Sequence, residues 1–158
     1  MATGTPATAL LARERVSFTL HPYRHDPRAD RYGEEAAAAL GMPADRVFKT
    51  LVVAVDGRLA CAVVPVAGRL DLKAFAAALG GKRAELAEPA SAARATGYVV
   101  GGISPLGQRA RLPVVVDESA ASFSSVLVSA GKRGLQVELA PADLIRLAGA
   151  RSAAITAY

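Results

Sequence analysis

The segment VFKTLVVAV places an ammonium group, that of Lys49, inside an otherwise apolar stretch with the composition of a strand. A buried charge without a partner is costly, so this position needs an explanation. Lys49 could lie at the exposed end or on the solvent face of a strand, with its stem packed and its charge in water. It could instead line a pocket and bind a phosphate or carboxylate, or polarise a carbonyl, with partner groups supplied by loops.

A glycine pair follows the apolar residues Tyr98–Val100 in the segment GYVVGGISPLG. Gly101 and Gly102 lack a Cβ, so backbone N–H groups there can approach a substrate closely, as an oxyanion site requires. An ordinary turn before Ser104 and Pro105 explains the same residues. The segment has neither the glycine spacing of a dinucleotide-binding motif nor the Gly-Lys-Ser/Thr ending of a P-loop.

The segment HPYRHDP brings together His21, Tyr23, His25 and Asp26. Two histidines four residues apart form a metal pair on a helix, but the two prolines make this segment extended or turning. The sequence has no further histidine and a single cysteine, whereas a zinc site needs three or four ligands. We therefore expect a loop held by Asp and His hydrogen bonds, and no metal.

No protein nucleophile with a base beside it is evident in the sequence. Ser104 lacks a G-x-S-x-G elbow, and Cys61 lies in the apolar run LACAVVP, where a buried and inert thiol is expected. Either there is no covalent catalysis, or the substrate supplies its own nucleophile while the protein provides positioning and charge stabilisation.

Basic residues are in modest excess, with a formal net charge of +5 and a pI near 9.8. That balance is compatible with a polyanionic partner. Lys132 and Arg133, set between two glycines, form either a solvated hairpin tip or a phosphate contact. Further basic points of the same kind are Lys82, Arg83, Arg109 and Arg111.

The length of 158 residues fits one globular domain, which we expect to span residues 1–158. The N-terminal segment lacks the features of a signal peptide, and no apolar run approaches a membrane span. With one cysteine no intramolecular disulfide can form, so a reducing, cytoplasmic setting is expected.

Helix and strand signals alternate irregularly along the chain, which favours a mixed or largely antiparallel sheet with helices around it over a doubly wound parallel sheet. The strongest hairpin signal is Asp56-Gly57 between two apolar β-branched runs. Helices are predicted after Thr5, from Gly33 to Gly41, from Asp71 to Gly80, from Pro89 to Thr96 and near Pro141–Leu147. Strands are predicted at SFTLH, YVV, PVVVD, SSVLVS and LQVEL.

The segments HPYRHDP, YGEEAA, VFKTLVVAV, VVPVAGRLDLKAFAAALG, ATGYVVGGISPLGQ and SAGKRGLQVELAPADL occur together in this order. In them the chain resembles the YbaK family of Cys-tRNA(Pro) deacylases over nearly its full length. The resemblance implies an α+β single domain like the editing insertion of bacterial prolyl-tRNA synthetases, with a mixed β-barrel-like sheet surrounded by helices. It implies hydrolysis of the ester that joins a mischarged cysteine to the 3′ end of tRNA(Pro), assisted by the thiol of that cysteine.

The resemblance also implies the site. Lys49, Gly101 and Tyr23 match the family's functional positions: the lysine near the ester and the terminal adenosine, the glycine at the carbonyl site and the tyrosine in the pocket. The remaining substrate-binding positions are Thr50, Gly102, Ile103, Ser104 and Gln136. The expected partners are tRNA(Pro) and prolyl-tRNA synthetase, with no DNA, membrane, metal or organic cofactor.

One departure affects substrate preference: Gln136 stands where members of the family often carry an acidic residue. It could keep a hydrogen bond but not a negative charge. Deacylation of Ala-tRNA(Pro) or of a broader set of aminoacyl-tRNAs is therefore an alternative. A catalytically silent tRNA-binding or synthetase-binding module of the same fold is another, although Lys49 and the GGISPLG loop favour an enzyme.

Overall fold

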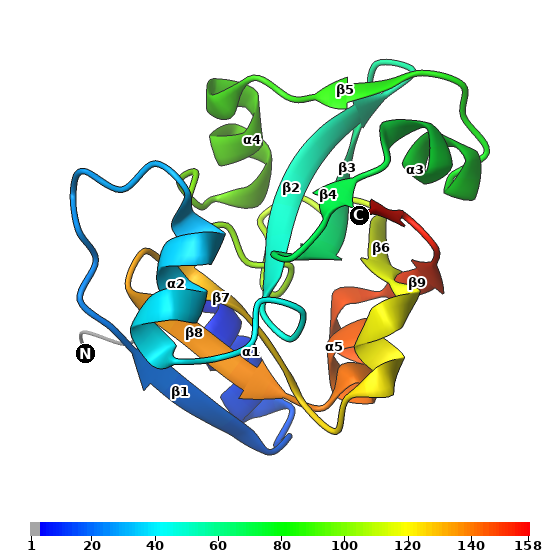
Figure 1. Ribbon diagram of the computed structural model, residues 1–158. Helices are drawn as coiled ribbons and strands as arrows, with labels where there is room; N and C mark the ends of the chain where they lie inside the picture. The colour runs from blue at the N-terminus through cyan, green and yellow to red at the C-terminus, as the bar shows by residue number, and fades with distance from the viewer. Residues whose placement is uncertain (1–3) are drawn as a thin grey trace.

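The computed structural model describes residues 4–158 of the chain (Figure 1). The predicted domain of residues 1–158 includes residues 1–3, which lie outside the described residues. Helices in the described part are α1 (Pro6–Arg13), α2 (Tyr32–Leu40), α3 (Leu72–Ala78), α4 (Pro89–Thr96), the 3-10 helix η1 (Glu118–Ser122) and α5 (Pro141–Ala148). Strands are β1 (Phe18–Pro22), β2 (Phe48–Val55), β3 (Arg58–Pro65), β4 (Arg69–Leu70), β5 (Ala84–Leu86), β6 (Val114–Asp117), β7 (Val126–Lys132), β8 (Leu135–Leu139), β9 (Ala150–Ala153) and β10 (Thr156–Ala157).

The strands of the described chain form three sheets. The largest has the order β5-β2-β3-β6-β9, in which β5, β2 and β3 are antiparallel and β3, β6 and β9 are parallel. An antiparallel sheet has the order β1-β8-β7, and β10 pairs with β4. The predicted mixed sheet with helices around it is confirmed. The sheets remain separate and do not close into a barrel, so the barrel-like description is corrected (Figure 1).

The β2–β3 hairpin forms as its turn residues predict. Asp56 and Gly57 have φ values of +50° and +83°, the conformation of a tight two-residue hairpin turn. This turn sets the register of the pair, which runs from Val55 opposite Arg58 to Phe48 opposite Pro65 and places Lys49 opposite Val64.

The predicted helices are confirmed, with caps that explain their limits. Thr5 and Asp71 accept hydrogen bonds from the third residues of α1 and α3. Gly41 and Gly97 take left-handed conformations after α2 and α4, with φ values of +63° and +81°.

The predicted strand at Tyr98–Val100 is wrong, because these residues form a bend and a turn. Tyr98 is buried within the loop and its hydroxyl donates to the Leu106 carbonyl at 2.7 Å. The Gly102 amide donates to the Val99 carbonyl at 2.8 Å, closing the turn. The segment is thus apolar because Tyr98 packs inside a loop, while the two valines are exposed and none of the three residues pairs in a sheet.

Two apolar clusters cover the faces of the five-stranded sheet. The larger fills the space between this sheet and β7 and β8, and includes Phe48, Val63 and Val128. The smaller lies on the other face, where α3 packs Phe75 against β2 and β3. Strand β2 therefore lies between two cores. No helix of residues 4–158 has the length and apolar character needed to cross a bilayer.

Candidate active site

A cavity of about 610 Å³ opens beside the first half of β2. Strand β5 pairs with β2 only at Val53–Val55, so residues 48–51 have no strand on that side. The start of α2, the 100–103 loop and residues 86–92 enclose the space instead. Backbone and side-chain groups of β2 are therefore accessible from the cavity.

Lys49 lies in the wall of this cavity. Its ammonium group donates to the Gly68 carbonyl at 3.2 Å, which uses one of its three N–H donors. Burial lowers the pKa of Lys49, and the nearby carboxylate of Glu34 partly opposes this shift. A half-buried cation with unused donors is suited to hold an anion or the developing negative charge of a carbonyl oxygen.

Gly33 brings the first turn of α2 close to Lys49. A Cβ at this position would lie 2.7 Å from Val66 Cγ2 and 3.7 Å from Lys49 Cβ. Only a residue without a side chain allows this approach, and Glu34 follows directly in the cavity lining.

Gly101 lies across the cavity in a left-handed conformation with φ +90°. A Cβ there would lie 2.8 Å from the Tyr32 ring and 2.9 Å from Arg133 Nε. Within residues 4–158 the amides of Gly101 and Ile103, which both line the cavity, make no hydrogen bond. Gly102 does not line it, because its amide is used in the turn and its Cα faces the backbone of Lys132 and Arg133.

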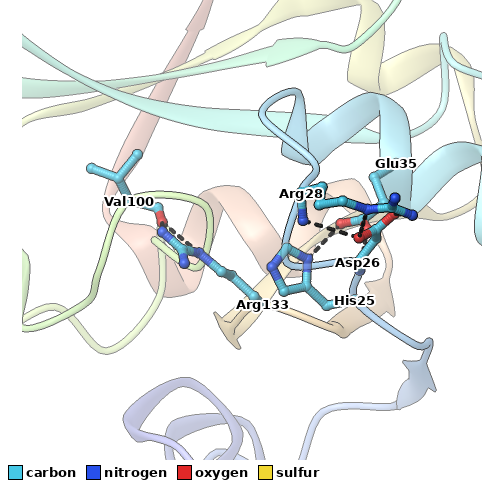
Figure 2. A network of polar contacts seen from close by, with 6 residues as sticks. All are labelled: His25, Asp26, Arg28, Glu35, Val100 and Arg133. Carbon is cyan, nitrogen blue, oxygen red and sulfur yellow. Dashed lines mark hydrogen bonds and ion pairs between the residues drawn. The ribbon is translucent and has the colours of Figure 1, made fainter.

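Arg133 binds the glycine loop through hydrogen bonds to the Val100 carbonyl (Figure 2). Its Nε and Nη2 donate to the Val100 carbonyl at 3.0 and 2.7 Å, and its guanidinium carbon lies 4.7 Å from the centre of the Tyr32 ring. Arg133 is exposed at the turn between β7 and β8, as a hairpin tip predicts, and its guanidinium is also bound to the loop.

The segment before α2 is held by hydrogen bonds of the kind expected for HPYRHDP. His25 Nδ1 lies 2.8 Å from Glu35 Oε1, and the Asp26 amide donates to the other oxygen of Glu35 at 2.7 Å (Figure 2). His21 pairs instead with Glu138 at 2.7 Å. The two histidines thus have separate carboxylate partners, and no group of three or more metal-ligating side chains occurs among residues 4–158.

Two buried polar atoms in the cavity lining have no hydrogen-bond partner among the described residues, Thr50 Oγ1 and Gln136 Oε1. An unsatisfied buried polar group costs about 1–3 kcal/mol. Both residues were expected to bind substrate, and both contribute to the cavity wall, although these two atoms themselves are buried behind it.

Tyr23 and Ser104 lie outside the cavity lining. Burial raises the pKa of Tyr23, while hydrogen bonds with the Gly134 backbone and the Gln136 side chain oppose the shift. Tyr23 therefore lies behind Gln136. Ser104 is fully buried, and its hydroxyl accepts from the Leu106 amide at 3.2 Å, which stabilises the loop.

Cys61 is buried, as expected, and receives a hydrogen bond from Gln108 at 3.1 Å. Burial raises the pKa of its thiol to about 11, so it is protonated at neutral pH. Within the described chain, the cavity lining contains no cysteine and no histidine. Its hydroxyls are those of Thr50, Ser129 and Tyr32, so no Ser-His or Cys-His pair is available there.

The structure thus brings together Lys49, Thr50, Gly101, Ile103 and Gln136, five of the eight predicted site residues. Sequence reasoning missed the roles of Tyr32, Gly33 and Arg69 in the lining. A glycine directly before the acidic start of a predicted helix was the available signal for Gly33; nothing local distinguished Arg69.

The cost and the role of the unpaired Thr50 hydroxyl can be tested by replacing Thr50 with valine, which has nearly the same shape. We expect Thr50→Val to be neutral or to raise the melting temperature by several degrees, because it removes a buried unpaired hydroxyl. We expect the same variant to lose turnover, because the family resemblance implies that Thr50 is one of the substrate-binding residues. Calorimetry and kinetics on Thr50→Val and on Thr50→Ser, which keeps the hydroxyl, check this; a destabilised but fully active Thr50→Val would contradict it.

The fold and the cavity define a small α+β protein with a partly apolar pocket whose wall includes a lysine and a glycine loop. Residues 26–147 match the aminoacyl-tRNA editing domain family, and the chain belongs to that family.

Among curated proteins, the chain is 41% identical over 124 residues to the "Putative Cys-tRNA(Pro)/Cys-tRNA(Cys) deacylase EbsC" of Enterococcus faecalis, covering 78% of this chain and 76% of that one. It is 31% identical over 145 residues to the multifunctional Ser/Thr-tRNA deacylase ProXp-y of Escherichia coli K12, covering 89% and 84%. It is 33% identical to the proline–tRNA ligase of Nitratidesulfovibrio vulgaris, over 79% of this chain but 21% of the ligase.

A solved structure of high similarity is that of the hypothetical protein APE2540, with a TM-score of 0.85 and 26% identity over 97% of this chain and 100% of that one. The predicted family is therefore confirmed by sequence and by fold.

Proposed function

We propose that the protein is a trans-editing hydrolase that removes cysteine from mischarged Cys-tRNA(Pro). The observation that carries the proposal is a single cavity whose wall includes Lys49, Gly101, Ile103, Thr50 and Gln136. The similarity to a protein named as a Cys-tRNA deacylase supports this substrate. Similarity to one segment of a proline–tRNA ligase supports tRNA(Pro) and an association with prolyl-tRNA synthetase. A reaction on charged tRNA would take place in the cytoplasm.

In the proposed reaction the substrate supplies the nucleophile. The deprotonated thiol of the esterified cysteine attacks its own carbonyl carbon and forms a four-membered thiolactone. The ester C–O bond breaks, the terminal ribose oxygen takes up a proton as tRNA leaves, and water then opens the thiolactone to free cysteine. This route fits a lining without a cysteine or histidine, because the reacting thiol is already close to the ester.

The protein's part is positioning and charge stabilisation. Lys49 has unused N–H donors for the carbonyl oxygen or a neighbouring phosphate, and Gly101 and Ile103, whose amides make no hydrogen bond within residues 4–158, line the same cavity. Such fixed donors accelerate a reaction when they bind the charge that develops in the transition state. In this proposal Thr50 and Gln136, which also line the cavity, bind the polar groups of the aminoacyl end.

The pH profile is expected to have two limbs. The rate rises toward the pKa of the substrate thiol, about 8.5 for a free cysteine, because the thiolate attacks. It falls at higher pH when Lys49 loses its charge, at a lower pH than an ordinary lysine would because burial lowers its pKa. Single-turnover rates between pH 6 and 10 measure both limbs. In Lys49→Arg the residual activity should keep the rising limb and lose the falling one; a flat profile in the wild type would contradict thiol assistance.

Substrate choice is tested with esters of cysteine, serine, threonine, alanine and proline on the same tRNA(Pro). We expect release of cysteine to be fastest, because alanine and proline carry no nucleophile on the side chain. Serine and threonine belong in the panel because one relative is named as a Ser/Thr-tRNA deacylase. Equal rates for cysteine and alanine would refute the assisted mechanism.

A further inference from the structure

We propose that a second cavity, beside the β2–β3 turn, binds the phosphates of the tRNA acceptor arm that lead into the candidate active site. It has a volume of about 520 Å³ and is lined by Lys73, Lys82 and Arg83, together with the hairpin turn and strand β5. This inference rests on the proposed function, and it adds a nucleic-acid contact outside the cavity that holds Lys49.

Three segments of the chain connect the two cavities. Residues 48–52 of β2 line the first cavity, and Ala54 and Asp56 line the second. Along β5, Leu86 belongs to the first and residues 83–85 to the second. Arg69 lines the first, and Lys73, on the next helix α3, lines the second. The cavities are therefore neighbours along β5, which forms one edge of the five-stranded sheet.

The basic side chains of the second cavity have no ion-pair partner among the described residues. Lys82 and Arg83 bind the Asp56 carboxylate through their backbone amides, which both donate to it at 3.0 Å. These hydrogen bonds lower the pKa of Asp56, and the nearby charges of Lys82 and Arg83 contribute to the same shift. The cavity lining contains three cations and two carboxylates, those of Asp56 and Glu85, and one of the carboxylates is held by backbone amides.

The proposed substrate explains why cations would lie at this place. An ester held next to Lys49 leaves the preceding nucleotides outside the first cavity, with one negative charge per phosphate. Asp56 follows Lys49 by seven positions along extended β2, a distance of about 23 Å, so several nucleotides could lie between the two cavities. Lys and Arg contacts of this kind position a nucleic acid without reading its sequence.

The other basic points from the sequence are placed differently. The guanidinium of Arg133 is bound to the Val100 carbonyl and stacked on Tyr32. Arg109 lies beside Gly97 at the end of α4, and neither Arg109 nor Arg111 lines either cavity. Among the basic pairs picked out in the sequence, Lys82 and Arg83 therefore have the geometry of a phosphate site.

The test compares two substrates of different length. The variant Lys73→Gln/Lys82→Gln/Arg83→Gln is assayed on full-length Cys-tRNA(Pro) and on a cysteinyl ester of the trinucleotide CCA, whose two phosphates are too close to the ester to reach the second cavity about 23 Å away. We expect kcat/KM on the full tRNA to fall about tenfold or more and its salt dependence to weaken by about 2–3 in log-log slope, roughly one unit per lost phosphate contact. The trinucleotide ester should react within twofold of wild type. The matched control Arg13→Gln/Arg94→Gln/Arg111→Gln removes three exposed charges from elsewhere and should leave both rates unchanged.

Equal losses on both substrates, or no loss on the full tRNA, would overturn the inference. If the wild type deacylates neither substrate, the proposed function fails, and binding of uncharged tRNA(Pro) measured by fluorescence anisotropy decides the inference alone. Weaker binding by the first triple variant and not by the control supports it; equal binding overturns it. Loss of binding to prolyl-tRNA synthetase with tRNA binding intact would instead assign the cavity to a protein partner.

Discussion

Replacing Lys49 by methionine is expected to lower the single-turnover rate of cysteine release by about 100-fold or more. The exchange keeps the aliphatic stem that packs in the cavity wall and removes the ammonium group that faces it. Loss of one preorganised charge donor at a developing oxyanion typically costs a factor of about 10²–10³ in rate. The measurement is release of labelled cysteine from Cys-tRNA(Pro) at saturating enzyme.

Stability separates this effect from misfolding. The half-buried ammonium of Lys49 costs desolvation, as its lowered pKa shows, so Lys49→Met is expected to fold and to melt at or above the wild-type temperature. Arg58→Met removes an exposed cation from the far end of the same hairpin and serves as the control. A Lys49→Met protein with wild-type turnover would remove Lys49 from the chemistry.

Gly101→Ala is expected to abolish turnover while the protein still folds. The backbone at Gly101 has φ +90°, and a methyl group there would lie 2.8 Å from the Tyr32 ring and 2.9 Å from Arg133 Nε. The strain costs about 1–3 kcal/mol. It can be relieved if the loop moves, and that movement displaces the amides of Gly101 and Ile103 from the cavity. Larger residues such as leucine should act in the same way.

Gly80→Ala is the matched control for this substitution. Gly80 has φ +74°, and a Cβ there would meet nothing within 4 Å. It therefore carries a similar backbone penalty without the contacts to Tyr32 and Arg133. We expect Gly80→Ala to lower the melting temperature and keep its activity. Wild-type turnover in Gly101→Ala, or equal activity losses in both variants, would show that the glycine loop is not part of the site.

Much of the fold could be predicted from local residues. Asp56-Gly57 specifies a tight hairpin turn, and Thr5, Asp71 and Gly97 mark helix ends, because these features depend on a few adjacent residues. Strands β4 and β10 have two residues each and exist through their pairing with one another, which no local pattern reveals. The apolar Tyr98 misled the prediction because it packs inside a loop.

The site was predictable in part for the same reason. Lys49 stands out because a charge interrupts an apolar strand, whatever the rest of the fold. In contrast, the glycine loop is held by contacts among Tyr32, Gly101 and Arg133. These residues are 32 to 101 positions apart in the chain, so no local pattern could reveal the contacts. The resemblance to a family identified positions such as Thr50 and Gln136, but their unpaired atoms became visible only when the cavity was assembled.

The most direct test of the account is release of labelled cysteine from Cys-tRNA(Pro), measured beside Ala-tRNA(Pro) and Pro-tRNA(Pro), with Lys49→Ala as the inactive control. We expect rapid loss of cysteine, slow or no loss of alanine and proline, and no activity in the variant. Release of none of the three amino acids by the wild type would contradict the assignment as a hydrolase and indicate a tRNA-binding or synthetase-binding module with the same fold.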